Sequence, residues 1–224
     1  MKVIVTGATG MVGKGVLLEC LEHEDIEEVL SISRRSLGMD HPKLKELLHA
    51  DFSEFDSVAK KLKGYNACYA CMGVSAAGLK EEEYTRLTYD YTLALARVLW
   101  RLNSNMTFVY VSGQGTRSDG KGSMWARVKG KTENDLLGIG FQQAYMFRPG
   151  MIIPVKGVSP SSKLYRVLIN NLTWLLKLMK KLAPKSVVDS SQIGQAMINI
   201  SYEGYSKKVI DPSDILQLVA KEEK

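Results

Sequence analysis

The sequence is poor in cysteine and in histidine, with three of each among its 224 residues. An odd and small number of cysteines argues against a disulfide framework and suits a reducing compartment, so we expect a cytoplasmic protein. Cys68 and Cys71 form a C-x-x-C pair, but no second pair accompanies it and its apolar setting predicts buried packing. His23, His41 and His49 stand apart from one another, so we expect no metal site.

Long apolar runs are also missing. No stretch of 18 uninterrupted apolar residues occurs, which predicts no membrane-spanning helix. The apolar stretch after Met1 is too short for a signal-peptide core, so we predict no secretion signal. The net charge of +6 would favour an anionic ligand, but it is too small to indicate nucleic-acid binding. With 45% hydrophobic and 24% charged residues, the composition is typical of a single globular domain.

Short β-branched and apolar stretches alternate with helical patterns as far as residue 150. We expect strands at 2–6, 27–33, 47–50, 66–72, 107–112 and 143–147, and helices at 10–23, 80–102 and 123–137. This alternation predicts an α/β fold, a Rossmann-like doubly wound parallel sheet with helices on both faces.

The pattern changes after residue 150. A loop is expected at 151–162, helices at 163–182, 191–202 and 213–222, and a strand at 206–210. We therefore divide the chain into a Rossmann-like domain, 1–150, and a small helical substrate lobe, 151–224, that completes the same domain. The apolar and basic helix at 163–182 is interpreted as a core or lid helix, with a partner groove or a membrane-surface contact as alternatives.

A glycine loop lies at the first junction between a strand and a helix. Thr6–Gly13 reads T-G-A-T-G-M-V-G, with the spacing G-x-x-G-x-x-G. Gly7 suits the tight turn, Gly10 lets the backbone approach a pyrophosphate, and Gly13 lets the helix pack close to the strand. The amino end of the helix then offers its N–H groups and its dipole to the phosphates. We therefore predict a dinucleotide site whose contacts are Gly7, Thr9, Gly10, Met11, Val12 and Gly13.

Two arginines end the second expected strand. Folds of this kind that prefer NAD usually carry an acidic residue there for the ribose hydroxyls, whereas this chain has Arg34 and Arg35. Guanidinium groups suit a 2′-phosphate, and one of them could also stack on adenine. The pair predicts that NADP(H) is preferred and that NAD(H) can still bind.

These features resemble the short-chain dehydrogenase/reductase superfamily, in particular its atypical, NmrA-like branch, which contains the Tat-interactive-protein-like oxidoreductases and is related to the NAD-dependent epimerases and dehydratases. The similarity covers nearly the whole chain. It rests on Thr6–Gly13, Arg34-Arg35, Asp51-Phe52, Cys71-Met72-Gly73, Val111-Ser112-Gly113, Val128-Lys129-Gly130 with Glu133, and Phe147-Arg148-Pro149-Gly150.

The resemblance implies contacts for the adenosine half of the cofactor. Asp51 would accept a hydrogen bond from the adenine amine, and the backbone of Phe52 would line the same pocket. Met72 and Gly73 would pass beneath the adenosine ribose.

For the nicotinamide half, the resemblance implies that Lys129 bonds the ribose hydroxyls. Pro149, Gly150 and Met151 would border the nicotinamide. Ser112 fits the serine that steadies the oxygen of the substrate.

The resemblance fails at one catalytic position. Enzymes of this superfamily usually place a tyrosine four residues before the lysine, on the same helical face. Here that position is Trp125, whose indole N–H donates a hydrogen bond but exchanges no proton near neutral pH.

Two functions remain open. In the first, the protein is an NADP-dependent oxidoreductase or a sugar-nucleotide epimerase-like enzyme whose substrate is an unknown small molecule, as the retention of Ser112 and Lys129 favours. In the second, it is a catalytically weak NADP(H)-binding sensor or regulatory protein that acts through a partner, as Trp125 favours. A homo-oligomer is compatible with both.

Overall fold

The structure, a computed structural model, describes residues 1–158 and 186–220. Within these residues a seven-stranded sheet has the strand order β3-β2-β1-β4-β5-β6-β9, and every neighbouring pair is parallel. The strands are β1 Lys2–Thr6, β2 Glu28–Ser33, β3 Leu44–Leu48, β4 Ala67–Ala70, β5 Thr107–Val111, β6 Gln143–Phe147 and β9 Val209–Ile210. The predicted doubly wound α/β fold is thus confirmed.

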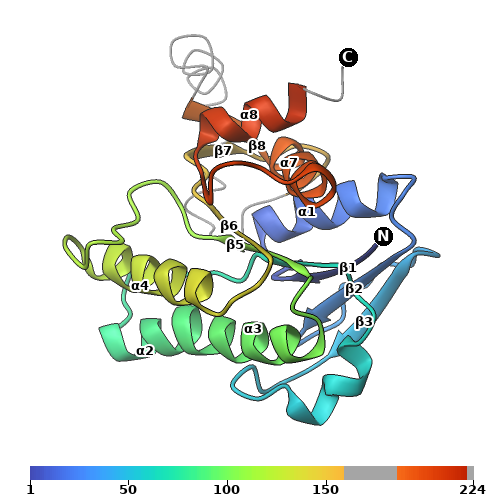
Figure 1. The fold of residues 1–224 in the computed structure, drawn as a ribbon, viewed down its shortest axis with the longest axis horizontal. Coiled ribbons are helices and arrows are strands. Elements are labelled where there is room, and N and C mark those ends of the chain that lie inside the picture. The colour runs from blue at the N-terminus through green and yellow to red at the C-terminus, as the bar shows by residue number, and fades with distance from the viewer. Residues whose placement is uncertain (159–185, 221–224) are drawn as a thin grey trace.

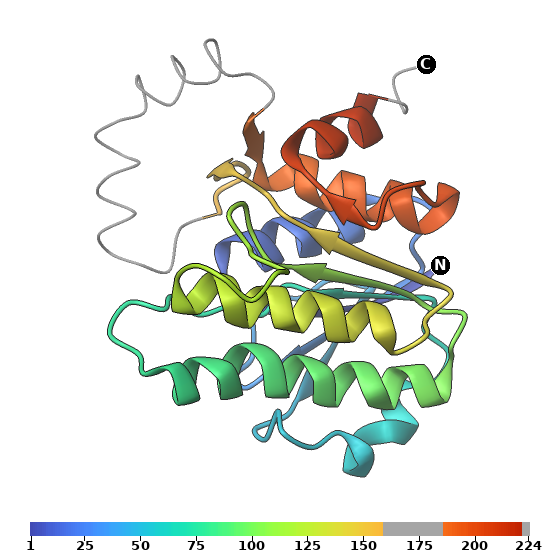
Figure 2. The ribbon, with the colours of Figure 1, turned by 60° about the vertical axis from the view of Figure 1, so that its left-hand side comes forward.

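Helices cover both faces of this sheet (Figures 1 and 2). One face carries α1, Met11–Glu22, and α7, Ser190–Glu203, with α8, Pro212–Ala220, beside α7. The other face carries α3, Tyr91–Leu102, and α4, Met124–Gly138. The helix α2, Glu81–Thr85, leads into α3 through a π-helical turn at Arg86–Asp90. Such layering follows from parallel strands, whose connections cross over the sheet as helices.

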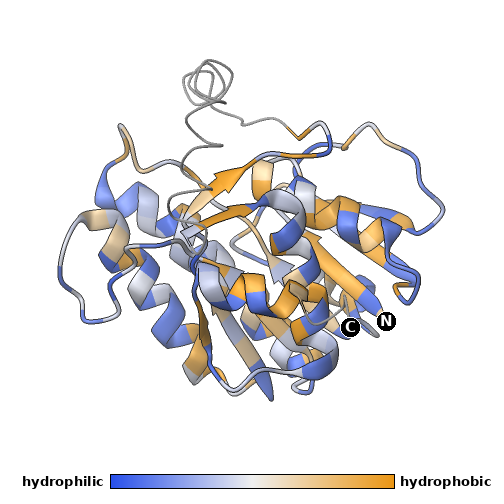
Figure 3. Cartoon of the chain, turned by 90° about the horizontal axis from the view of Figure 1, so that it is seen from above, coloured by the Kyte–Doolittle hydropathy of each residue, from blue (hydrophilic) through white to orange (hydrophobic). Residues whose placement is uncertain are grey.

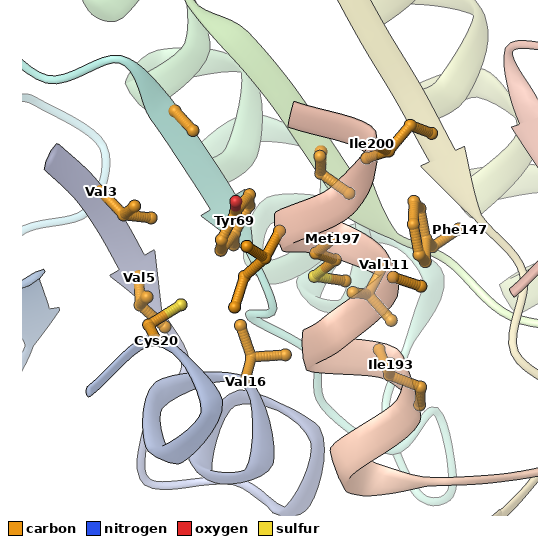
Figure 4. Packing of buried hydrophobic residues seen from close by; sticks show 14 of the residues in the cluster. Val3, Val5, Val16, Cys20, Tyr69, Val111, Phe147, Ile193, Met197 and Ile200 are labelled. Atoms are coloured by element: carbon orange, nitrogen blue, oxygen red, sulfur yellow. The ribbon is translucent and has the colours of Figure 1, made fainter. Parts of the chain in front are cut away.

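The core is built by strands that are buried on both sides. In β1, Val3 and Val5 point into the cluster beneath α1 and α7, whereas Ile4 points into the cluster beneath α3 and α4. Figure 4 shows Val5 beside Cys20, and Met197 beside Val111, in the first cluster. In Figure 3 the strands are largely hydrophobic, while hydrophilic residues gather on the outer turns of the helices. The β-branched sequence of β1 therefore reflects its central place in the sheet.

The described part of the tail belongs to the same core. The helix α7 packs closely on α1, because a Cβ on Gly194 would lie 2.7 Å from Cγ of Glu19. The strand β9 extends the central sheet beside β6. A small parallel sheet pairs β7, Met151–Ile153, with β8, Val187–Asp189.

Several predicted elements need correction. The third strand begins at Leu44 rather than at residue 47, because an edge strand with charged and exposed positions has a weak hydrophobic pattern. The helix expected at 80–102 contains the π-helical turn, and the 3₁₀ helix Asp56–Leu62 was not predicted. The loop expected at 151–162 includes β7, whose pairing with β8 is too distant in sequence to predict locally. The helix predicted at 163–182 lies outside the described residues.

Among the helices of the described residues, none is both long and apolar enough to cross a membrane.

Candidate functional site

The glycine loop lies at the carboxyl end of β1, where the chain order of the sheet reverses between β2 and β4. Gly7 has a φ of +71°, and a Cβ there would lie 2.5 Å from the carbonyl oxygen of Cys71. A Cβ on Gly13 would lie 2.3 Å from the carbonyl oxygen of Gly7. These two glycines therefore let the turn, the end of β4 and the first turn of α1 approach one another, as their spacing predicts.

Gly10 differs from the other two glycines. It is the N-cap of α1, and a Cβ there would meet only the carbonyl oxygen of Gly7, at 3.3 Å. Gly10 provides no side-chain cap, and no acidic residue lies in the first turn. The positive end of the α1 dipole and its unpaired N–H groups are thus left for an anion.

A cavity of about 220 Å³ opens beside this loop. Of the predicted cofactor contacts, its wall contains Gly7, Thr9, Gly10, Arg34, Phe52, Met72 and Gly73. The other lining residues, which the sequence reasoning did not assign to the site, are Ile32, Ser33, Cys71, Val74, Leu87 and Tyr91. The structure thus gathers one wall from the ends of β1, β2 and β4 and from the start of α3.

One side of the cavity is an aromatic and aliphatic slot. The rings of Phe52 and Tyr91 have centroids 6.2 Å apart, and Phe52 packs edge-on against Phe55 at 5.5 Å. The π-helical turn brings Leu87 to the same wall. Turns of this kind frequently occur at functional sites. A slot of this composition suits the face of a flat aromatic ring such as a purine.

The polar end of the cavity lies after β2. Arg34 lines the cavity and Arg35 is exposed, and the hydroxyl of Ser33 donates to the carbonyl oxygen of Arg35 at 2.7 Å. Within residues 1–158 and 186–220, neither arginine forms an ion pair. The two guanidinium groups are therefore available to an anion.

Asp51 lies near this region but outside the cavity wall. Its Oδ1 accepts hydrogen bonds from the backbone N–H of Ser53 at 2.9 Å and from the Ser53 hydroxyl. These two bonds hold the pKa of the Asp51 carboxyl below its usual value. Its contact with an adenine amine stays a prediction.

The C-x-x-C pair is split between the two faces of the sheet. Cys68 is buried in the cluster beneath α3 and α4, whereas Cys71 packs against the opposite cluster and is only partly buried. Burial raises the pKa of the Cys71 thiol to about 12, so it is no reactive thiolate at neutral pH. No group of three metal-ligating side chains occurs in the part of the chain that the structure describes.

The predicted catalytic residues form a second cluster, at the carboxyl ends of β5 and β6. Lys129 and Trp125 lie one turn apart on α4, as their spacing predicts. The ammonium group of Lys129 donates to the carbonyl oxygen of Ser112 at 2.5 Å. Burial lowers the pKa of Lys129 to about 8, although the nearby Glu133 carboxylate opposes this shift. Lys129 is therefore mostly charged at pH 7 but loses its proton more readily than an exposed lysine.

The hydroxyl of Ser112 is engaged inside the protein. It donates to Oε1 of the buried Glu133 at 2.5 Å, and Glu133 also pairs with Arg148, whose Nε lies 2.9 Å from Oε1. Ser118 donates to the second carboxylate oxygen at 3.2 Å. The role of Ser112 towards a substrate stays a prediction. The structure shows that Glu133 holds the Ser112 hydroxyl and that Arg148 holds Glu133, whereas in the sequence both residues are visible only as parts of motifs.

The Glu133–Arg148 pair should be important for stability. We expect Glu133→Gln to lower the free energy of unfolding by about 3 kcal/mol, because it leaves a largely buried guanidinium without its carboxylate. For a domain of this size the melting temperature should fall by roughly 6–12 °C. Thermal unfolding followed by circular dichroism would measure the change.

The matched control is Glu81→Gln, which breaks the exposed pair between Glu81 and Arg127. An exposed pair contributes less than about 1 kcal/mol, so this variant should melt close to the wild type. Equal decreases in melting temperature for the two variants would show that the buried Glu133 pair stabilises the fold no more than an exposed ion pair.

Trp125 and the residues predicted to border the nicotinamide, 149–151, lie around the loop that follows β5. A Cβ on Gly115 would lie 3.1 Å from Cη2 of Trp125, so the indole packs over the loop that follows β5. In that loop the backbone N–H of Gln114 donates to the carbonyl oxygen of Pro149 at 3.0 Å. Oε1 of Gln114 lies 2.8 Å from the place that a Cβ on Gly150 would take. Pro149, Gly150 and the following Met151 thus run beside Gln114, a polar residue that the sequence reasoning did not single out.

Comparison with known proteins is consistent with this geometry. The model of the NAD dependent epimerase/dehydratase family matches residues 3–132. The chain is similar to Protein FMP52, mitochondrial, of Candida albicans, with 23% identity over 94% of this chain and 92% of that protein. It is also similar to Protein HTATIP2 of Rattus norvegicus, with 26% identity over 67% of this chain and 62% of that protein.

The fold is similar to that of solved enzymes at low identity. The Bordetella bronchiseptica enzyme WbmF in complex with NAD+ superposes with a TM-score of 0.69 at 14% identity, covering 98% of this chain and 76% of that one. A short chain dehydrogenase family protein from Francisella tularensis superposes with a TM-score of 0.66 at 16% identity, covering 96% of this chain and 99% of that one.

One prediction is wrong on this comparison. The chain was expected to be cytoplasmic, but the FMP52 relatives from several yeasts and from Emericella nidulans are named mitochondrial. The expectation rested on free cysteines, which indicate reducing conditions rather than one particular compartment.

Proposed function

The chain belongs to the NAD-dependent epimerase/dehydratase family, and from this premise we propose that it binds NADP(H) in preference to NAD(H). The pyrophosphate would lie on the amino end of α1, at Gly7, Thr9, Gly10, Met11, Val12 and Gly13. The adenine would occupy the slot beside Phe52, with Met72 and Gly73 beneath its ribose. The open face of Gly10 and the cavity beside it support this assignment.

Arg34 and Arg35 carry the preference for the 2′-phosphate. A charge-assisted hydrogen bond contributes about 1.5–3 kcal/mol, so NADPH should bind at least about tenfold more tightly than NADH. We expect the double variant Arg34→Ala, Arg35→Ala to lose this preference while its affinity for NADH stays close to that of the wild type. Isothermal titration calorimetry with both cofactors measures the two affinities.

Equal affinities of the wild type for NADPH and NADH would contradict the proposed preference. If the double variant loses affinity for NADPH and NADH to the same extent, the arginines act on the fold or bind a chemical group that both cofactors contain.

For the reaction, we propose an oxidoreductase or an epimerase-like enzyme in which the nicotinamide, when bound, supplies hydride transfer. Lys129 would hold the nicotinamide ribose, and Pro149, Gly150 and Met151 would border the ring. Ser112 would face the oxygen of the substrate. The substrate is a small molecule that the sequence and the fold leave unnamed. Two similar folds, WbmF with NAD+ and UDP and MoeE5 with UDP-glucose and NAD, keep nucleotide sugars among the candidates.

A second function is favoured by Trp125. An indole exchanges no proton near neutral pH, so the family's usual general acid and base is missing from its place. Under this alternative the protein is an NADP(H)-dependent sensor or regulatory protein that acts through a partner. Hydride exchange with a panel of carbonyl compounds and quinones separates the two, because a catalytically weak sensor would show little or no turnover with any of them.

A further inference from the structure

Lys14 lies on the face of α1 that leads back to the glycine loop. It follows Gly10 by one helical turn, and its backbone N–H donates to the carbonyl oxygen of Gly10 at 2.9 Å. Side chains on a helix lean towards its amino end, so the Lys14 side chain leans towards the end that carries the loop. The lysine is half-buried rather than extended into solvent.

The contact that its ammonium group makes is a weak one. Nζ of Lys14 lies 3.0 Å from Sδ of Met39, and a thioether is a poor hydrogen-bond acceptor. No carboxylate pairs with Lys14 in the described part of the chain. The exposed Lys156 instead bonds the carboxylates of both Glu19 and Glu22, each at 2.5 Å. Lys14 is therefore a partly desolvated cation without an anion.

Met39 places this cation beside the loop that carries the two arginines. The loop runs from Arg34 to Met39 after β2, and Glu46 on β3 fixes its course. The two carboxylate oxygens of Glu46 accept from the Ser36 hydroxyl at 2.9 Å and from the Leu37 backbone N–H at 2.8 Å. The Glu46 carboxylate is thus occupied by the loop itself, and the Lys14 ammonium group remains for a ligand.

We propose that Lys14 is a third cation of the 2′-phosphate site and a determinant of the preference for NADP(H). The inference rests on the proposed function, because it needs the cofactor at the glycine loop. Phosphate oxygens are far stronger acceptors than a thioether, so Nζ exchanges Met39 for the phosphate when the cofactor binds. A phosphate has several oxygens to share, and cations from α1 and from the loop after β2 reach it from two directions.

The test is calorimetric titration of Lys14→Met with NADPH, NADH, 2′,5′-ADP and 5′-AMP. This substitution keeps most of the apolar stem and removes the ammonium group. We expect the affinities for NADPH and 2′,5′-ADP to fall about tenfold, while those for NADH and 5′-AMP stay within about twofold of the wild type. Lys14→Arg should keep the preference, which covers the case in which the methionine variant folds poorly.

Two controls separate a direct contact from other effects. Lys60→Met removes one exposed positive charge from the 3₁₀ helix and should leave all four affinities unchanged. Met39→Leu removes the thioether and should leave the preference intact.

An equal loss of NADPH and NADH affinity in Lys14→Met would overturn the inference in favour of a pyrophosphate contact. Unchanged affinities of Lys14→Met for all four ligands would also overturn the inference, because Lys14 would then only pack against Met39. A wild type that binds neither cofactor would refute the proposed function itself, a result distinct from both.

Discussion

Replacing Trp125 with tyrosine is expected to raise the rate of NADPH oxidation with ketone or aldehyde substrates by roughly 10²–10⁴-fold. Trp125 and Lys129 lie one turn apart on α4, so the variant would place a phenol near an ammonium group. That charge should lower the pKa of the phenol and supply a general acid and base. The measurement is the loss of NADPH absorbance across a panel of carbonyl compounds, for the wild type and the variant.

The pH profile and a second substitution test the cause of this gain. Because the pKa of Lys129 is about 8, the gain should decline as the pH rises through that value and the ammonium loses its proton. Adding Lys129→Met to the tyrosine variant should cancel the gain. A wild type that already turns over carbonyl compounds rapidly, with the tyrosine variant no faster, would mean that the proton comes from another group.

The second large effect is expected at Gly10. Gly10→Val should abolish measurable NADP(H) binding, because a side chain there would occupy the place of the pyrophosphate on the amino end of α1. The domain should still fold, since Gly10 has an extended backbone with φ −92° and ψ 169° and a Cβ meets only one atom, at 3.3 Å. Thermal unfolding with and without NADPH reports both properties at once.

Gly138→Val is the matched control, because Gly138 lies at the end of α4 and a Cβ there would meet nothing within 4 Å. This variant should keep the rise in melting temperature that NADPH gives the wild type. If Gly10→Val keeps that rise as well, the glycine loop is not the cofactor site.

The central strands and the glycine loop could be predicted from the sequence because their signals are local. Residues 3–6 of β1 are β-branched and buried, and Gly7 and Gly13 occur where the backbones crowd. The sequence places the edge strand β3 three residues too late, because exposed charged positions such as Lys45 and Glu46 weaken its hydrophobic pattern. The pairing of β7 with β8 depends on a contact between distant segments, which local periodicity does not encode.

The motifs of the candidate site could be predicted from the sequence, but the other residues that line its cavity could not. Leu87 and Tyr91 look like ordinary core positions of a helix, and only the π-helical turn and the packing of α3 bring them to the cavity. Ser112 could be recognised by its place after β5, but the direction of its hydroxyl depends on the buried pair of Glu133 and Arg148. Side-chain direction of this kind follows from tertiary packing, which a single sequence does not reveal.

The most direct test of the account is a crystal structure of the protein grown with NADP+. We expect the pyrophosphate on the amino end of α1 at Gly10, the 2′-phosphate beside Arg34 and Arg35, and the nicotinamide ribose at Lys129. Cofactor bound at any other surface, or a 2′-phosphate directed away from both arginines, would contradict it.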